Sequence, residues 1–460
     1  MRTEIDARSP AFRGAVSAAR SAWARLRGDA AILLGAAAIA GLAACEDGPV
    51  DPGDGCEGPD CPPVAGPPVT VASPASDVIV HSLTLARSSD GAAVTAGWSE
   101  LYDKERLFVA ASSDGGATFG APAQLTPPAD ADLSYIRLVA PDSGGMLAGA
   151  VAQLPDPESS FRHAWPRVYR SADTSASFDL AADLKSAIGD RSFTQGTFAA
   201  SADGKTLVYA WVDTTPTEWL GPDSAPAGTL LVSSSTDSGA TFTAPAVVSA
   251  TPFLSCSRIV GFVRDGRAGI VYAEEREIAG QPVKVGVPAL ALAGEDGGFQ
   301  EPVLVASDDY GAVPAGGAIG SDGAAPGAAL GPDGSIHVAW WSARTVGLWY
   351  AVSEDGLAFS EPVRVLDTTS PTPANVRVSV DGTGAAWVAA LDVDSVRVVQ
   401  IPPGEAPVEI ADAASPLGST GDTFDIAGLP GEGAMQLWLG VGSGGDTATS
   451  LPIHLRVIAP

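Results

Sequence analysis

The side chains that most often bind metal ions are few and scattered in this sequence. Its four histidines lie far apart without metal-ligand spacing: His81, His163, His337 and His454. A zinc site is therefore not expected. Two acidic pairs, Asp130 with Asp132 and Asp308 with Asp309, offer the hard oxygen atoms that calcium prefers. Solvated acidic loops are the alternative interpretation of both pairs, and we expect no obligate cofactor.

Composition excludes several other classes of function. No phosphate-binding glycine loop and no Gly-x-Ser-x-Gly nucleophile elbow occurs. With 26 basic and 54 acidic residues the formal charge is −28, which does not favour nucleic acid or an anionic lipid surface as a partner. The 460 residues are 45% hydrophobic and can bury a large core, while 53 Gly and 37 Pro indicate many tight turns between short strands. An all-β fold is the first expectation.

A short turn-like motif recurs along the chain. Its two best copies, residues 112–119 and 235–242, both fit Ser-x-Asp-x-Gly-x-Thr-Phe. Weaker copies occupy residues 171–178, 295–299 and 353–359. The aspartates of the five copies are 59, 64, 59 and 59 residues apart, which indicates a repeated structural unit of that length.

In this motif the chain resembles the Asp-box (BNR-repeat) proteins, whose best-known members are sialidases and whose fold is a β-propeller. The resemblance implies that Ser and Asp side chains hydrogen-bond within a turn, that Gly takes a positive φ and that the aromatic ring packs into the blade. The residues that would do so here are Ser112, Asp114, Gly116, Phe119, Asp173, Phe178, Ser235, Asp237, Gly239, Phe242, Asp296, Phe299, Ser353, Asp355 and Phe359. The motif is a folding device and implies a fold, not an activity.

A second repeat pairs an Asp-Gly turn with an aromatic residue 6 to 8 positions later. The aromatic residues are Trp98, Trp211, Tyr272, Trp340 and Trp387. Asp-Gly between apolar runs is a strong hairpin signal. We expect these rings to pack between neighbouring blades, with a ladder for stacking ligands as the alternative.

The two repeats predict a single all-β propeller over residues 69–460. Seven four-stranded units begin near residues 78, 133, 193, 254, 325, 372 and 422. Six blades are the alternative, because the last two units lack the first motif. The seventh unit is one strand short, and residues 68–72 would supply that strand, so that pairing of the two ends closes the ring.

In such a meander the repeated turns share one face, so function is expected on the opposite face. Its longest loops span residues 153–167, 213–228 and 274–283. They carry Glu158, Arg162, His163, Trp165, Glu218, Trp219, Glu274, Glu275 and Arg276. A shorter loop and the links between blades add Tyr102, Asp103, Lys104, Arg106, Tyr135 and Tyr310.

The sialidase resemblance implies an arginine triad that clamps a carboxylate, a tyrosine nucleophile polarised by a glutamate, and an aspartate as acid and base. The candidates here are Arg137, Arg258, Arg377, Tyr310 and Glu274. The arginines precede their turn aspartates by 5, 7 and 4 residues, so they do not share one register. The family's Phe/Tyr-Arg-Ile-Pro motif is also missing, since residues 78–81 read VIVH.

The first 44 residues have the order of an export signal. Six arginines precede the apolar run AAILLGAAAIAGLAA, which at 15 residues is shorter than the ~20 that span a bilayer. This run ends in Leu-Ala-Ala-Cys and resembles a bacterial lipoprotein precursor. The resemblance implies that Cys45 becomes the lipidated first residue of the mature chain. A short membrane anchor with a chance cysteine is the alternative.

Residues 45–68 are rich in Asp, Glu, Gly and Pro and predict a disordered tether. Within it Cys56 and Cys61 suit a local disulfide outside the cytoplasm, with metal binding as the alternative. Cys256 lies in an apolar stretch and is expected to be a buried, unpaired thiol, with a nucleophile as the alternative.

The sequence thus predicts a lipoprotein anchored in the bacterial cell envelope, on its periplasmic or extracellular side. The expected role is binding of an extracellular glycan or an envelope protein. A sialidase-like exo-acting glycoside hydrolase is the alternative, and a passive structural module is a third. An enzyme would require at least two convergent arginines and a carboxylate pair around a pocket.

Overall fold

The protein divides into two units, residues 1–58 and 59–460, and the description below concerns the second. The computed structural model describes residues 63–75, 78–102, 104–128, 131–155, 162–172, 177–189, 191–193, 196–215, 228–250, 252, 259–277, 284–295, 297–307, 326–342, 345–367, 375–392, 395–410, 415–416, 423–440 and 452–459. The signal segment with Cys45, the cysteines Cys56 and Cys61, and Cys256 lie outside these ranges.

The described chain forms seven antiparallel sheets in sequence order, each built as a meander from an inner to an outer strand. Blades one to three contain β3 (Ile79–Arg87), β4 (Val94–Leu101), β5 (Glu105–Ser112) and β6 (Ala123–Gln124); β7 (Asp132–Val139), β8 (Met146–Pro155), β9 (Arg162–Ser171) and β10 (Asp179–Asp183); β11 (Gly196–Ala200), β12 (Leu207–Val212), β13 (Leu230–Ser235) and β14 (Ala246–Ser249). Blades four and five contain β15 (Val260–Arg264), β16 (Arg267–Glu277), β17 (Lys284–Leu292) and β18 (Val303–Leu304); β19 (Gly327–Leu330), β20 (Ile336–Ser342), β21 (Gly347–Ser353) and β22 (Val363–Leu366).

Blade six contains β23 (Val376–Val380), β24 (Ala386–Asp392), β25 (Ser395–Ile401), β26 (Val408–Glu409) and β27 (Ser415–Pro416), and blade seven contains β28 (Phe424–Gly428), β29 (Ala434–Leu439) and β30 (Ile453–Ala459). Among the described residues the single helix is α2 (Lys185–Ile188), four residues long, between blades two and three. No helix within the described ranges has the length and hydrophobicity needed to cross a membrane.

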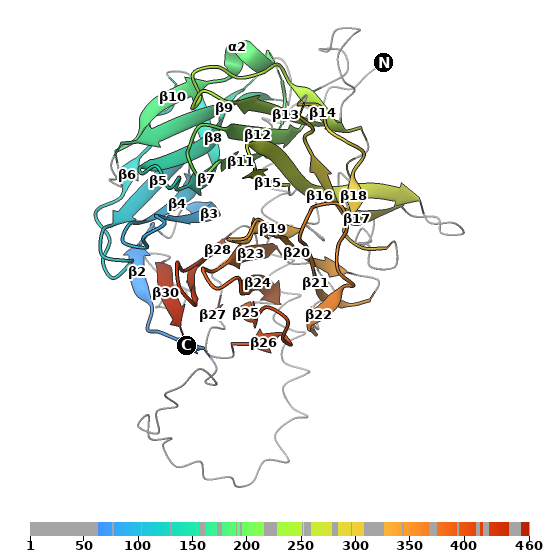
Figure 1. The fold of residues 1–460 in the computed structure, drawn as a ribbon. Coiled ribbons are helices and arrows are strands. Elements are labelled where there is room, and N and C mark those ends of the chain that lie inside the picture. Colours follow the sequence, from blue (N-terminus) through green and yellow to red (C-terminus); the bar gives the residue numbers. More distant parts are fainter. Residues whose placement is uncertain are drawn as a thin grey trace, which may run out of the picture. The chain divides into compact units, whose positions relative to one another are not determined.

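The inner strands close into a ring. Each of them contacts the inner strand of the next blade, from β3 and β7 through to β28, and β28 in turn contacts β3. Figure 1 shows the sheets following one another around a common centre in chain order. The prediction of a seven-bladed propeller is confirmed, and the six-bladed alternative is wrong because both motif-poor units form full sheets.

The two ends of the propeller pair with each other, as predicted. β2 (Val69–Ala72) runs antiparallel to β30, with Val69 opposite Leu455. A second segment, β1 (Val64–Ala65), pairs with the end of β30, with Val64 opposite Ala459. The N-terminal contribution to blade seven therefore begins before the expected boundary at residue 69.

Side-chain oxygens join neighbouring blades at the inner strands. Among the described residues, four such oxygens accept a hydrogen bond from a backbone N–H of the next blade: Thr84 from Leu138 (3.2 Å), Thr197 from Gly261 (3.0 Å), Ser379 from Gly428 (2.7 Å) and Asp425 from Leu85 (2.9 Å). Each bond satisfies a backbone group at a seam between blades, where it would otherwise lose water without a partner. The Asp425 bond is the one of the four that joins blade seven to blade one.

The aromatic residues of the second repeat pack in the core. Trp98, Trp211, Tyr272, Trp340 and Trp387 are all at most 1% exposed. The prediction that they pack between blades is confirmed, because a ladder for ligands would have to be accessible.

The Asp-Gly turn of blade six, at residues 381–382, departs from the simple pattern. Its positive φ (88°) belongs to Gly384 and not to Gly382. Asp381 is buried, and its carboxylate accepts hydrogen bonds from the Trp387 Nε1 (2.8 Å) and from the backbone N–H of Gly433 in blade seven (3.0 Å). Here the aspartate links two blades and does not occupy the exposed tip of the turn.

The first motif closes turns between the third and fourth strands of its blades. In residues 112–119 the Asp114 carboxylate accepts bonds from the Thr118 N–H (2.9 Å) and from the Ser112 hydroxyl (2.7 Å). Ser112 Oγ in turn accepts a bond from Gly116 N (2.9 Å), whose φ of 90° an L side chain rarely adopts. Hydrogen bonds from Thr118 and Ser112 lower the pKa of Asp114 to about 2.

The other copies follow this geometry as far as they are described. The turn at residues 235–242 has the same hydrogen bonds. In the shorter motif copy at 353–359, Gly356 N donates to Ser353 Oγ (2.9 Å). Phe119, Phe178, Phe242, Phe299 and Phe359 are partly buried against the blade cores. Asp173 and Asp296 lie outside the described residues.

Ring closure gives a prediction about stability. Val71 of β2 is 5% exposed in the core shared by blades seven and one, whereas Val64 of β1 is 59% exposed. Val71→Asp should lower the free energy of unfolding by ~3 kcal/mol or more, because it buries a charge without a partner. Thermal and urea unfolding of the full chain would measure the change, with Val64→Asp as the matched control. Equal effects of the two variants would contradict closure through β2.

Candidate functional site

The inner strands begin on the face opposite the repeated turns. The connections from second to third strands lie on that same face, and we call it the loop face. Several of its long loops fall outside the described residues, at 156–161, 216–227 and 278–283, together with Glu158, Glu218 and Trp219. The site is therefore built from the remaining part of this face.

A group of charged and polar residues lies where blades one and two meet on the loop face. Asp132 begins β7 and Arg162 begins β9, and Arg162 Nη1 lies 3.6 Å from Asp132 Oδ2. The same guanidinium nitrogen donates a hydrogen bond to Gln153 Oε1 at 3.3 Å. Glu105 begins β5 in blade one and interacts electrostatically with both Arg162 and Asp132. We call Glu105, Asp132, Gln153 and Arg162 the blade 1/2 cluster.

Strand alternation positions the Glu105 side chain. Glu105, Leu107 and Val109 lie on one face of β5, because successive side chains point to opposite sides of a strand. Leu107 and Val109 are fully buried in the core that blade one shares with blade two. The Glu105 carboxyl is thus directed toward blade two at the loop-face end of the same row.

The pKa of the Glu105 carboxyl is raised. Burial raises its pKa, a hydrogen bond from Ser99 and the charge of Arg162 lower it, and the neighbouring Asp132 carboxylate raises it slightly, so that the pKa is about 7. A carboxyl with this pKa exists in both protonation states near neutral pH. It can accept a hydrogen bond, donate one, or act as a general acid or base.

Exposed apolar surface lies beside the blade 1/2 cluster. Tyr102 is 69% exposed and follows Leu101, which pairs with Glu105 across one hairpin and with Ile79 across the other. Ile79 is itself 55% exposed. An open aromatic ring next to a row of polar groups is an arrangement that suits a ligand with both apolar and hydroxyl surfaces.

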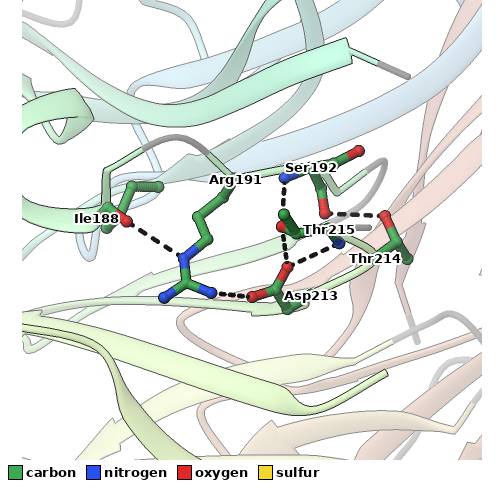
Figure 2. A network of polar contacts seen from close by, with 6 residues as sticks. All are labelled: Ile188, Arg191, Ser192, Asp213, Thr214 and Thr215. Atoms are coloured by element: carbon green, nitrogen blue, oxygen red, sulfur yellow. Dashed lines mark hydrogen bonds and ion pairs between the residues drawn. The ribbon is translucent and has the colours of Figure 1, made fainter. Parts of the chain in front are cut away.

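A second polar network holds the link into blade three (Figure 2). Arg191 Nη1 lies 2.7 Å from Asp213 Oδ2, and the Asp213 side chain is fully buried. Asp213 Oδ1 accepts bonds from the Thr215 N–H and hydroxyl, and Thr215 Oγ1 accepts one from Ser192 N (2.8 Å). Because these groups satisfy one another, the network fixes the base of the loop after β12.

Two of the three candidate arginines meet at the centre of the ring. Arg377 of β23 is 5% exposed, and its Nε lies 3.4 Å from Asp425 Oδ1. Burial raises the pKa of Asp425, and the charges of Arg377 and then Arg137 lower it. Both arginines therefore interact with a carboxylate of the protein itself at the closing seam. Arg258 lies outside the described residues.

Glu274 lies in blade four, away from Arg377 and Asp425. The Glu274 Oε2 accepts a hydrogen bond from Ser249 Oγ (2.8 Å). Glu274 lies two residues after Tyr272 on β16. Burial and then the Glu274 carboxylate raise the pKa of Tyr272, whose side chain is 1% exposed. This tyrosine is inaccessible to a substrate, and Tyr310 lies outside the described residues.

The proposed calcium ligands are only partly described. Asp132 is engaged by Arg162, while Asp130, Asp308 and Asp309 fall outside the described ranges. Within those ranges no group of three or more His, Cys, Asp or Glu side chains is placed to hold a metal ion.

The chain is similar in fold to solved structures of low sequence identity. No family model and no curated protein matches the sequence. Among solved structures, an α-L-arabinanase from Penicillium chrysogenum in complex with arabinobiose has a TM-score of 0.50 at 13% identity, covering 85% of this chain and 98% of its own. An α-L-arabinofuranosidase from Fusarium graminearum has a TM-score of 0.48 at 13% identity over 85% of this chain and 97% of its own. A sialidase from Streptococcus pneumoniae has a TM-score of 0.41 at 15% identity over 85% of this chain and 70% of its own.

Sequence reasoning named the neighbours of Glu105 in its loop but not Glu105 itself. The signal was present, because Glu105 continues the alternation of buried Leu107 and Val109. Asp425 carried no such local signal, since its partners come from blades one, two and six.

Glu105 gives a prediction about pH. Its folded pKa of about 7 exceeds the ordinary 4.5. The stability that depends on the neutral carboxyl is therefore fully present below pH 4.5 and is lost as the pH rises through 7. Glu105→Gln removes this dependence. The free energy of unfolding of the variant minus that of wild type should increase by ~2–3 kcal/mol when the pH is raised from 4.5 to 8. Urea unfolding at both pH values tests this, with the exposed Glu301→Gln as control, and parallel pH curves for all three proteins would show that Glu105 ionises normally.

Proposed function

We propose that this protein binds an extracellular glycan on its loop face at blades one and two, and that a lipid on Cys45 anchors it in the cell envelope. The observation that carries the proposal is the exposed Tyr102 ring on the hairpin that carries Glu105 of the blade 1/2 cluster. The fold it shares with an arabinanase that was solved with arabinobiose agrees with a glycan ligand.

The chemistry of a sugar matches this surface. A pyranose or furanose has C–H faces that pack on an aromatic ring and a rim of hydroxyls that both donate and accept hydrogen bonds. Tyr102 supplies the ring, Arg162 supplies donors and Asp132 supplies acceptors. Glu105 supplies either, according to its protonation state.

A glycoside hydrolase is the second candidate, and one observation favours it. Such enzymes use a protonated carboxyl as general acid beside a second carboxylate that serves as base or nucleophile. Glu105, with a pKa of about 7, could protonate a leaving glycosidic oxygen, and Asp132 is the carboxylate next to it. The arginines expected of a sialidase do not support a substrate clamp, because Arg377 and Arg137 face Asp425.

The glycan proposal predicts a defined loss of binding. A glycan array probed with the full chain should give signal, and Tyr102→Ala and Arg162→Ala should each weaken that binding at least tenfold. Leu357→Ala removes a similarly exposed apolar side chain (67%) from the opposite face and should leave binding unchanged. Equal binding by Tyr102→Ala and wild type would place the glycan elsewhere.

Turnover of fluorogenic sialosides and arabinosides separates binding from hydrolysis. Binding without turnover supports a binding protein. Turnover that Glu105→Gln abolishes while array binding persists would establish the hydrolase in its place. Silence in both assays would contradict the glycan ligand and favour an envelope protein as partner.

The anchor follows from the N-terminal sequence and agrees with the path of the chain. β1 pairs with the last residues of β30, at the face of the repeated turns. The described chain therefore enters the propeller on the turn face.

Lipidation predicts a labelling result. Cells that express the full chain and are fed an alkyne-tagged palmitate should yield a labelled, membrane-associated protein. Cys45→Ala should abolish labelling and retain the uncleaved leader, whereas Cys56→Ala should be labelled normally. Label on Cys45→Ala, or none on wild type, would contradict the lipid anchor.

A further inference from the structure

Blade six lacks the aromatic residue that the other motif turns carry. Residues 361–363 (Glu-Pro-Val) lead from the blade-five turn into β22, and residues 406–408 (Ala-Pro-Val) lead into β26 in the same way. Aligning these segments places Gly404 where Phe359 stands in blade five. The loop before it reads Pro402-Pro403-Gly404, in place of a Ser-Asp turn.

In the described motif turns this ring fills space toward the preceding blade. Phe359 of blade five packs in a cluster with Phe262 and Leu290 of blade four, and Phe119 of blade one packs in a cluster with Leu437 of blade seven. With Gly404 at this position, no such ring enters the corresponding space between blades six and five.

A cavity of about 630 Å³ occupies this place on the turn face. It is bordered by turns of blade five near Asp333 and Glu354 and by turns of blade six near Thr383 and Glu405. Its apolar surface includes Val352, Val363, Ile401 and the prolines of both blades. The volume lies within the range of cavities that bind small ligands.

One wall of the cavity is a chain of hydrogen bonds. Ser335 Oγ donates to Asp333 Oδ1 (2.5 Å), and His337 lies between Ser335 Oγ (2.7 Å from Nε2) and Tyr350 OH (2.5 Å from Nδ1). Because Ser335 has one proton to donate, His337 Nε2 donates to it and Nδ1 accepts from Tyr350. Burial lowers the pKa of His337 to about 4, so this wall bears no positive charge at neutral pH.

The border of the cavity is negative. Asp333, Glu354 and Glu405 all line it, and none of the described lining residues is a lysine or an arginine. Arg264 of blade four donates to the Glu354 carbonyl (2.7 Å) from outside the lining. Hydrogen bonds from Ser335 lower the pKa of Asp333, which keeps that carboxylate ionised. The net charge of −28 also raises the local concentration of cations.

We propose that this cavity binds a small organic cation, a protonated amine or a guanidinium on a ring-bearing apolar body. The ring takes the space that the motif phenylalanine fills in the other turns, and the cationic group meets the carboxylates at the border. This site lies on the opposite face from the glycan site and stands independently of it.

The test compares a cationic probe with its neutral counterpart. Isothermal titration of the full chain with tryptamine should show binding, whereas tryptophol, which carries a hydroxyl in place of the ammonium, should bind at least fivefold more weakly. The double variant Glu354→Gln, Glu405→Gln should weaken tryptamine binding at least fivefold. Val363→Trp, which fills the cavity from an exposed position, should abolish it.

The control is Glu432→Gln, which removes an exposed charge from the turn face of blade seven and should leave binding unchanged. Thermal unfolding of each variant confirms that it is folded. Equal affinity for tryptamine and tryptophol, an unaffected double variant, or no binding of tryptamine by wild type would each overturn the proposal.

Discussion

The structure depends on the closure of one ring by contacts between residues far apart in the chain. β2 pairs with β30 across the outer edge of blade seven, and Asp425 accepts the Leu85 N–H across the inner seam. Without these contacts blades one and seven would each expose a sheet edge or an inner seam. The inner contact requires burying a carboxylate, and Arg377 and Arg137 offset only part of the cost, because burial still raises the pKa of Asp425.

The two faces of the closed ring have different roles. On the turn face, Asp114, Asp237 and Asp355 are bound by groups of their own turns, so sequence variation there mainly affects folding. On the loop face the connections are longer and their polar groups, such as Glu105 and Arg162, lie between blades. Blade six is the exception, because loss of the motif ring opens a cavity on the turn face.

The sequence predicted what depends on local repetition. The Asp-Gly turns identified Trp98 and Trp387 as core residues, and counting strands in the last unit identified residues 68–72 as its missing member, of which 69–72 form β2. It could not predict contacts that exist only after closure. Asp425 has no motif, and its partners lie about 50 to 340 residues away. The arginines that precede the turns were visible as a set, but the sequence could not show that Arg377 and Arg137 face an internal carboxylate.

The central claim is that the loop face at blades one and two holds the ligand. Hydrogen exchange of the full chain, with and without the glycan that gives the strongest array signal, tests it most directly. The account predicts protection confined to residues 98–106, 131–135 and 153–167, with the turns at 112–119 and 235–242 unchanged. Protection on the turn face, or in blades four to six alone, would contradict it.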